Sequence, residues 1–359
     1  MVFLSLGVRA LVNVEALNMV ESVGNIVRHR KAAIVYKRDS AYVVRWVPAV
    51  SGESLAHSYQ ALLAFLARQR GLPVCTYCSK HEFVKHADRR IFGDLDWEKK
   101  LASRLESIEG DKGGKKSGKQ QQVNALEVMH EVEKTIITNC VVEDIGGFLY
   151  AGKKPVKRTS RFSCSFMIPA LDAVEKAVVE TQFQVRHAPT ASQVWDQAQM
   201  PYNVEVGSAV YAWSFYMDLS SIGCTSAVKS ECLGDDERRK RVELAIDALA
   251  LMLDSRLFGA KHSRFMPVVG YELILVTLSK PLPFNVSPPA MGPCFVEDTV
   301  KRIEAFVKAT NSSVEVYGYA GDGDAEKLLK ANNVKVYKTI VELFEEVKRK
   351  ALEWLKLQA

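Results

Sequence analysis

Long apolar runs are missing from this chain of 359 residues. The longest fall well short of the roughly 18 residues that a membrane-spanning helix needs, so the sequence predicts no transmembrane segment and no membrane partner. The first residues, MVFLSLGVRALVNVE, lack a basic leading region and a small-residue cleavage site. They are expected to form a strand instead of a signal peptide, and the protein is expected to be cytoplasmic.

Signatures of the common enzyme classes are also missing. The chain has no GxxxxGK[ST] phosphate loop and no GxSxG nucleophile elbow. The GDGD segment at residues 321–324 lacks the carboxylate spacing of a calcium loop. The sequence therefore predicts no catalytic residue and no cofactor.

The seven cysteines show one informative spacing. Cys75 and Cys78 form a Cys-x-x-Cys pair, and His81 and His86 follow, which gives four potential zinc ligands within a short segment. However, no second Cys-x-x-Cys pair exists. A zinc site and a local disulfide stay open, but ordinary packing of buried cysteines is the favoured interpretation, and no metal is predicted.

The composition is that of a globular protein with a modest excess of positive charge. Hydrophobic residues make up 48% and charged residues 25%, with a formal net charge of +6. The length allows one large domain or two ordinary ones. A net charge of this size permits an anionic partner but does not require one. The positions of the basic residues along the chain therefore decide how the net charge is interpreted.

The positive charge is concentrated after the Gly146–Gly147 pair. Between Gly152 and Arg161 no acidic residue offsets the basic ones, and Thr159 and Ser160 add hydroxyl groups. Alternating apolar residues from Phe162 to Ile168 then predict a strand. A flexible basic loop that leads into a strand suits binding of a polyanion, although a solvated surface loop is an equally good interpretation. The basic residues are Lys153, Lys154, Lys157, Arg158 and Arg161.

Two further glycine-containing segments, residues 18–31 and 258–264, carry groups that bind phosphate or 2′-hydroxyl oxygens. Ser51, at the start of a predicted helix, adds backbone N–H groups. His29 lies among basic residues, which should lower its pKa and favour phosphate contact over catalysis. The candidate residues in these segments are Asn18, Ser22, Asn25, His29, Arg30, Lys261, Ser263 and Arg264, together with His57 on the helix.

The predicted elements alternate along the chain. Ser51 suits the cap of a helix over residues 53–70, and Asp235 or Asp236 suits the cap of a second helix with an apolar stripe. The order strand, helix, strands, helix, strand predicts an α+β fold with a ferredoxin-like, RNA-recognition-motif-like antiparallel sheet and large insertions. The strands are expected at residues 2–14, 33–37, 42–47, 178–187, 204–219 and 271–278.

The predicted sheet occupies residues 1–280, with a helical insertion at 72–144. Inside this insertion the run at 109–122 is dominated by glycine, lysine and glutamine and contains nothing apolar. It is expected to be a disordered loop, because it cannot offset its ordering entropy. A proline-rich linker begins at Pro281, and residues 281–359 are expected to form a C-terminal α/β extension that packs on the sheet.

Four segments, in this order, carry a resemblance to a known family. They are LVNVEALNMVESVGNIVRHRKA, VPAVSGESLAHSYQALL, DIGGFLYAGKKPVKRTSRFSCSFMIPA and FGAKHSRFMPV. The chain resembles the archaeal CRISPR-associated protein seven family, the DevR-type autoregulator group that forms the backbone of type I-A Cascade. The resemblance covers about residues 1–280. It does not explain the Cys75/Cys78 segment or the loop at 109–122.

The resemblance implies a non-catalytic, crescent-shaped subunit with an RNA-recognition-like palm and a protruding thumb. Copies would polymerise head to tail along a CRISPR RNA, with other Cascade subunits, and support pairing of the guide with target DNA. The candidate residues named above would bind RNA. The thumb would be a hairpin at residues 184–203, with Met200 as a wedge between bases.

Two alternatives stay open. The first is a metal-independent endonuclease for CRISPR repeat RNA, which would use His29 or His57 with a lysine. The second is a DNA-binding autoregulator, which would need a recognition helix with exposed arginines. The most basic helix, near residues 238–241, suits that role poorly because its arginines are bunched in the first turn.

Overall fold

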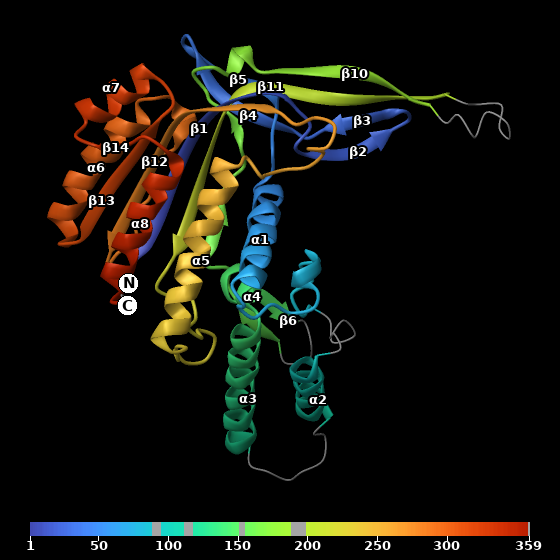
Figure 1. Cartoon of the computed structure of the whole chain (residues 1–359), viewed down its shortest axis with the longest axis vertical. Coiled ribbons are helices and arrows are strands. Elements are labelled where there is room, and N and C mark those ends of the chain that lie inside the picture. Colours follow the sequence, from blue (N-terminus) through green and yellow to red (C-terminus); the bar gives the residue numbers. More distant parts are fainter. Residues whose placement is uncertain (88–94, 111–117, 151–154, 188–198, 358–359) are drawn as a thin grey trace.

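A computed structural model describes residues 1–87, 95–110, 118–150, 155–187 and 199–357. Its elements run in one sequence of strands and helices (Figure 1). The strands are β1 (Phe3–Glu15), β2 (Met19–Val23), β3 (Ile26–His29), β4 (Lys31–Arg38), β5 (Ala41–Pro48), β6 (Phe148–Tyr150), β7 (Val156–Arg158), β8 (Phe162–Cys164), β9 (Ile168–Pro169), β10 (Val178–His187), β11 (Gln199–Asp218), β12 (Val268–Lys280), β13 (Ser313–Ala320) and β14 (Lys335–Tyr337). The helices are α1 (Gly52–Gln69), α2 (Asp96–Gly110), α3 (Gly118–Asn139), α4 (Val141–Gly146), α5 (Asp235–Asp254), α6 (Phe295–Thr310), α7 (Gly323–Ala331) and α8 (Ile340–Leu355), with short 3-10 turns at η1 (Cys78–Lys80), η3 (Val174–Lys176) and η5 (Pro289–Met291).

A large sheet forms the body of the molecule. Its central strands lie in the order β12, β1, β11, and both neighbours of β1 run antiparallel to it. β8 and β9 extend one side of β11, and β10 pairs with its other end. β13 pairs antiparallel with β12, but β14 pairs parallel with β13 and β3 pairs parallel with β11. The prediction of an antiparallel sheet is therefore wrong in this respect, because the whole sheet is mixed.

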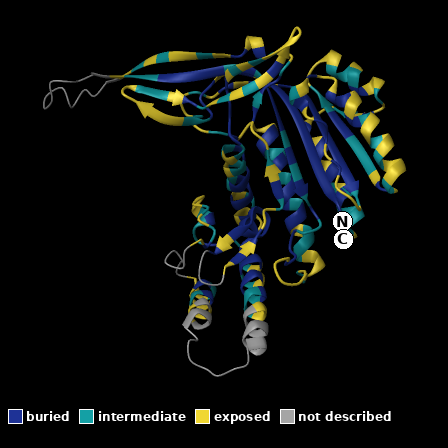
Figure 2. Ribbon diagram, turned by 180° about the vertical axis from the view of Figure 1, so that it is seen from behind, coloured by how far each residue is buried: buried dark blue, intermediate teal, exposed yellow. Residues whose placement is uncertain are grey.

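Helices cover the sheet on both faces. On one face α5 packs between α1 and α8, and its apolar stripe is fully buried, as the sequence predicts. On the other face Val286 and Phe295 contact the strand β1 at Gly7, where an added Cβ would lie 3.0 and 3.2 Å from them. β1 is therefore almost wholly buried, and Figure 2 shows the central strands as the core of the molecule.

The helix α1 begins where its sequence predicts. The Ser51 hydroxyl accepts a hydrogen bond from the Ser54 backbone N–H, so Ser51 caps the helix. In contrast, α5 is preceded by Gly234 and has no side-chain cap, so the expected cap at Asp235 or Asp236 is wrong. Among the described helices, none has a stretch long and apolar enough to cross a membrane.

The two ends of the insertion after α1 lie next to each other, because the Val141 N–H donates to the Pro73 carbonyl at 2.9 Å. In between, α2 packs along α3, and the pair projects from the sheet (Figure 1). Both helices run into the segment expected to be a disordered loop, since α2 includes Gly110 and α3 starts at Gly118. That prediction is wrong at these ends, and residues 111–117 lie outside the described residues.

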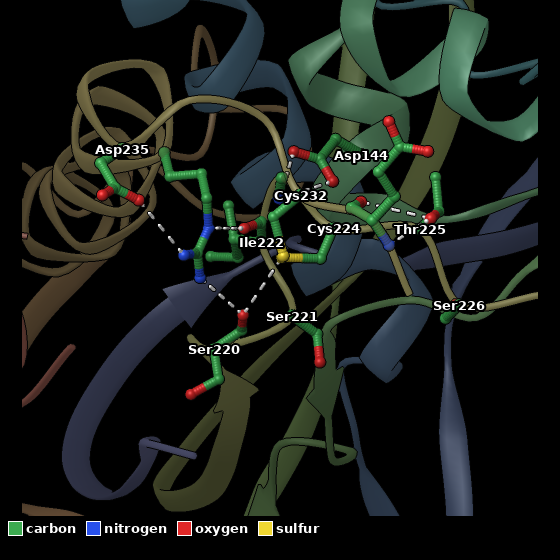
Figure 3. Close-up of a disulfide and its surroundings, with 12 residues drawn as sticks. Asp144, Ser220, Ser221, Ile222, Cys224, Thr225, Ser226, Cys232 and Asp235 are labelled. Atoms are coloured by element: carbon green, nitrogen blue, oxygen red, sulfur yellow. Dashed lines mark hydrogen bonds and ion pairs between the residues drawn. A yellow bond between two sulfur atoms is a disulfide. The ribbon is translucent and has the colours of Figure 1, made fainter. Parts of the chain in front are cut away.

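The loop between β11 and α5 is closed by a disulfide that the sequence interpretation missed. Cys224 and Cys232 are bonded, and Figure 3 shows the loop around them. Arg238 of α5 donates to the carbonyls of Ser220 and Ile222, at 3.0 and 3.3 Å. The disulfide and these bonds fix the loop against the first turn of α5.

Candidate nucleic-acid interface

A surface hollow of about 540 Å³ lies where Arg30, just after β3, meets the start of α1 and the basic segment. It brings together three predicted RNA-binding residues that are far apart in the sequence, Arg30, Ser51 and Ser160. The remaining lining residues that matter for recognition are Gly52, Gln60, Lys85, Gly146, Phe162 and Phe166.

The hollow presents positive charge and unsatisfied polar groups. The Arg30 Nε and the Gln60 Oε1 are buried and have no hydrogen-bond partner among the described residues. The Lys85 ammonium donates to the Gly146 carbonyl at 2.9 Å, which holds a second cation at the rim. Glu53 is the acidic residue of the lining. A guanidinium such as that of Arg30 is well suited to bind a phosphate group.

The start of α1 adds to this positive character. The first N–H groups of a helix have no carbonyl partner within the helix, and the helix dipole favours an anion there. Ser51 and Gly52 at this end line the hollow. Phe166 also lines it and is 46% exposed, which leaves an aromatic face that a base can stack on.

The β2–β3 hairpin carries Ser22 and Asn25, both exposed, around the turn at Gly24, where φ is +59°. Asn18 lies at the base of the hairpin and accepts a hydrogen bond from the Ser51 N–H at 2.8 Å. Asn18 therefore positions the hairpin against α1, which is a structural task that the sequence did not indicate.

His29 requires a correction. Its side chain is buried, with Nε2 2.7 Å from Glu15 Oε1, so it is not available to a phosphate. Burial disfavours the charged ring, but the hydrogen bond and charge of Glu15 outweigh this and raise the pKa of His29 above 6.5. The expected lowering of its pKa by neighbouring cations is wrong, because the ring points away from them to a buried carboxylate.

Arg158 requires the same correction. Strand β7 pairs with β6 and places the Arg158 side chain inside the protein, where it is fully buried. Its guanidinium forms ion pairs with Asp144 and with Glu133, the latter at 3.1 Å, and donates to the Cys224 carbonyl at 2.7 Å. Because these acids and carbonyls occupy its donors, Arg158 is part of the core and not a phosphate contact.

The neighbouring basic residues differ from Arg158. Lys157 is exposed on the other side of β7. Arg161 is half-buried and donates to the Ser226 hydroxyl at 2.8 Å, and burial together with the charge of Arg158 lowers its pKa. Lys153 and Lys154 lie outside the described residues.

The thumb segment is described in part. β10 and β11 form a long antiparallel ladder that reaches beyond the body of the sheet (Figure 1). Met200 lies in this ladder opposite Arg186. The tip at residues 188–198 is outside the described residues, and so is the Met200 side chain.

The second basic loop lies against α1 and the base of the hairpin. The Gly259 N–H donates to the Ser58 hydroxyl at 3.0 Å, and the Ala260 N–H donates to the Leu17 carbonyl at 2.8 Å. Arg264 donates to the Tyr202 hydroxyl at 3.2 Å. Lys261 is half-buried, whereas Ser263, Arg264 and, on α1, His57 are exposed.

Sequence reasoning missed Lys85 and Phe166 as members of the hollow. Lys85 lies in the insertion and carried no recognisable signal. Phe166 was assigned to one continuous strand, but the chain forms two short strands, β8 and β9, with Phe166 exposed between them. The half-apolar alternation from Phe162 to Ile168 contains this aromatic residue but does not show which side of the sheet it faces.

Comparisons with known proteins agree with one another. A family model described as CRISPR-associated negative auto-regulator DevR/Csa2 matches residues 6–302. A protein of Saccharolobus solfataricus named CRISPR-associated aCascade subunit Cas7/Csa2 2 is 38% identical over 301 residues, which cover 82% of this chain and 85% of that protein. A protein of Methanocaldococcus jannaschii named CRISPR-associated protein Cas7/Cst2/DevR is 28% identical over 334 residues, which cover 89% and 94%.

Solved structures share the fold. A chain in a structure titled CRISPR RNA-guided surveillance complex aligns with a TM-score of 0.51 over 97% of this chain and 99% of that chain. A second, titled CRISPR RNA-guided surveillance complex, pre-nicking, gives a TM-score of 0.50. The sequence identities are 9% and 10%, so these likenesses concern the fold.

Proposed function

Because the chain belongs to the CRISPR-associated DevR/Csa2 family, we propose that it is a backbone subunit of a type I-A Cascade complex that binds guide RNA without cutting it. The observation that carries the proposal is the hollow that brings Arg30, Ser51 and Ser160 together beside the start of α1. These groups suit the phosphate backbone of a single strand, which they would bind irrespective of sequence.

The strand order supports an RNA-recognition-like palm. β12, β1, β11 and β8 lie side by side, each antiparallel to its neighbour, and α1 and α5 connect them along the chain. This order supports the proposal of a ferredoxin-like unit. In the proposed palm the β10–β11 hairpin is the thumb, with Met200 near its tip, and residues 281–359 extend the sheet through β13 and β14.

The RNA path in this proposal follows the exposed groups. From the hollow it passes Lys157 on one side, and Lys153 and Lys154, outside the described residues, stay predicted contacts from the sequence. On the other it passes Ser22 and Asn25 of the hairpin and the second basic loop, with Lys261, Ser263 and Arg264. His57 lies on α1 between them. His29 and Arg158 do not contact the RNA in this proposal. Their buried ion pairs hold in place β3 and β7, which lie next to the path.

Repeated copies would place further chains along the same RNA. One face of the β4–β5 hairpin supports this, because Val44 and Trp46 are 67% and 70% exposed on a strand whose opposite face is covered by Val174 and Glu175. Apolar side chains in such a row are typical of a protein contact. We assign this face to a neighbouring copy, and target DNA would then pair with the guide along the filament.

The test is single-stranded RNA binding measured against salt concentration, for wild type, Arg30→Gln and Lys157→Ala. Each variant removes one positive charge, so each should bind more weakly and lower the slope of log K against log salt by about 0.7. Lys327→Ala is the matched control, because it removes an equally charged, exposed side chain on α7.

Equal slopes for the three variants and wild type would place the phosphate path elsewhere. Two other outcomes would replace the proposal. Metal-independent cleavage of repeat RNA to 2′,3′-cyclic phosphate ends would indicate an endonuclease, and tighter binding of duplex DNA than of RNA at equal salt would indicate a DNA-binding autoregulator.

A further inference from the structure

A group of metal-binding side chains lies beneath the hollow, outside the proposed RNA path. The Sγ atoms of Cys75, Cys78 and Cys140 and a carboxylate oxygen of Glu143 all lie within 4.8 Å of one another. Each of the four side chains is at most 1% exposed. Cys140 and Glu143 are more than 60 residues from the Cys-x-x-Cys pair, so the cluster exists only in the folded chain. We propose that these four residues bind a structural zinc ion.

The spacing fits a tetrahedral ion. Zinc–sulfur bonds of about 2.3 Å place the ligand atoms of a tetrahedron roughly 3.7 Å apart, which lies within the observed span. The Cys78 backbone N–H points to the Cys75 sulfur at 3.5 Å, a contact that suits a thiolate acceptor. Cys140 and Glu143 face the same side because they are three residues apart at the start of α4.

The carboxylate distinguishes this cluster from ordinary packing of cysteines. Buried thiols pack well among apolar neighbours. A fully buried carboxylate costs free energy unless it is paired or bound to a metal, and Glu143 Oε1 lies 3.2 Å from the Cys75 sulfur. His86 pairs with this carboxylate, and a zinc ion would in addition account for the place of the acid among three cysteine sulfurs.

A second layer of hydrogen bonds surrounds Glu143. His86 Nδ1 lies 2.6 and 2.8 Å from the two carboxylate oxygens, and His86 Nε2 lies 3.8 Å from Glu98. The Thr76 hydroxyl donates to Glu98 at 3.2 Å. Carboxylate–histidine pairs of this kind orient metal ligands in zinc sites. The sequence pattern pointed to His81 as well, but His81 is exposed and lies outside this group.

The donor set selects the metal class. Thiolates are soft ligands that favour zinc, copper(I) and iron–sulfur clusters over magnesium or calcium. Three cysteine sulfurs are shared with the common Cys3His structural zinc sites, a carboxylate oxygen is a further ligand that zinc accepts, and four buried protein ligands keep no position open for water. The ion would tie the segment from Cys75 to His86 to the helix α4.

The consequence for the hollow rests on the proposed function. Lys85 and Gly146 line the hollow, next to His86 and α4, and the Lys85 ammonium binds the Gly146 carbonyl. The zinc ion would therefore fix one wall of the RNA site. It would act as a positioning element and would take no part in chemistry.

The experiment measures metal in the full-length protein, expressed with added zinc and purified without chelator, by mass spectrometry of the elements. The expected result is about one zinc ion per chain. Cys78→Ser and Cys140→Ser should lose most of the zinc, whereas Cys294→Ser, which changes an exposed cysteine, should keep it. Cobalt added to the reduced, metal-free wild type should give the absorption of thiolate-bound tetrahedral cobalt.

Wild-type protein that holds no zinc and shows no thiolate–cobalt absorption would overturn the proposal. The wild-type measurements decide this even if the cysteine variants fail to fold. Both readouts are independent of RNA, so a failure of the RNA-binding proposal would leave the result for zinc unchanged.

Discussion

At the scale of single residues, the molecule depends on two arginines that are fully buried. Arg158 and Arg241 share the carboxylate of Asp144, and Glu133 pairs with Arg158. Arg241 also donates to the carbonyls of Ile137 and Thr138 at the end of α3. The network joins β7, α3, α4 and α5, so it fastens the insertion to the body of the protein.

Arg158→Ala should lower the free energy of unfolding by about 3–5 kcal/mol, because it leaves Asp144 and Glu133 buried with fewer partners. Lys157→Ala is the control, since it changes the adjacent but exposed residue and should alter stability by less than about 0.5 kcal/mol. Chemical denaturation of the two variants measures the difference. Equal stability of both would show that the network contributes little.

This pair also shows where the sequence falls short. The sequence predicts that the basic run is a flexible loop that leads into a strand and that its five cations bind RNA. In the structure residues 156–158 form a strand, and the alternation of a strand sends Lys157 outward and Arg158 inward. β6, the partner of this strand, lies just before it in the chain, but Glu133 and the Cys224 carbonyl, which receive Arg158, lie in other parts of the sequence. No local pattern contains that information.

At the scale of elements, the β2–β3 hairpin is held to the sheet through a buried pair. His29 lies against Glu15 of β1, Glu15 also accepts from the Tyr211 hydroxyl at 2.6 Å, and the His29 N–H donates to Glu205 at 3.0 Å. The hairpin therefore depends on the charge state of a histidine. Its tip carries Ser22 and Asn25 of the proposed RNA path.

The pairing of His29 should make stability depend on pH. Because the folded-state pKa of His29 is raised above 6.5, its contribution is complete below that pH and is lost as pH rises through the raised value. Wild type should therefore exceed His29→Gln in unfolding free energy more at acidic than at alkaline pH. Urea denaturation below pH 6.5 and at alkaline pH, above the raised pKa of His29, measures this.

His81→Asn provides the control for that experiment, because His81 is exposed and its left-handed backbone conformation is one that asparagine tolerates. A difference between wild type and His29→Gln that stays constant with pH would contradict the assignment.

Elements with a local signal were predictable, and those without one were not. Helix α1 follows from its serine cap and apolar spacing, and α5 from its buried stripe. The short strands β6 to β9 have only two or three residues each. β6 and β7 pair with each other, and β8 and β9 exist because the remote strand β11 pairs with them. The zinc cluster depends in the same way on a contact between the insertion and α4.

At the scale of the whole molecule, the β4–β5 hairpin exposes a row of apolar side chains that is unfavourable in an isolated subunit. Tyr42, Val44 and Trp46 alternate along β5 and point away from the protein. Val35 lies opposite Val44 on β4 and extends the same face. An apolar row of this length on a two-stranded sheet fits contact with another copy.

Trp46→Ser should reduce the number of copies that assemble on a long RNA, while leaving the affinity for a short RNA that covers one copy unchanged. The side chain is 70% exposed, so its loss should not affect folding. Light scattering after size-exclusion chromatography measures the mass of the assemblies. Phe65→Ser, at an exposed aromatic residue on α1, is the control, and equal assembly of the two variants would exclude this face.

The single hydrogen bond between Val141 and Pro73 has a consequence for how the molecule can change in length. The chain leaves the body and returns to it at adjacent residues, so the outer turns of α2 and α3 form a cassette whose ends are already joined. Loop-closure entropy grows only slowly with length, by about 0.6 kcal/mol for each doubling. Shortening or lengthening the outer turns of α2 and α3, while keeping the buried inner half of α3, would change how far these helices project. It would not shift the register of any strand in the sheet.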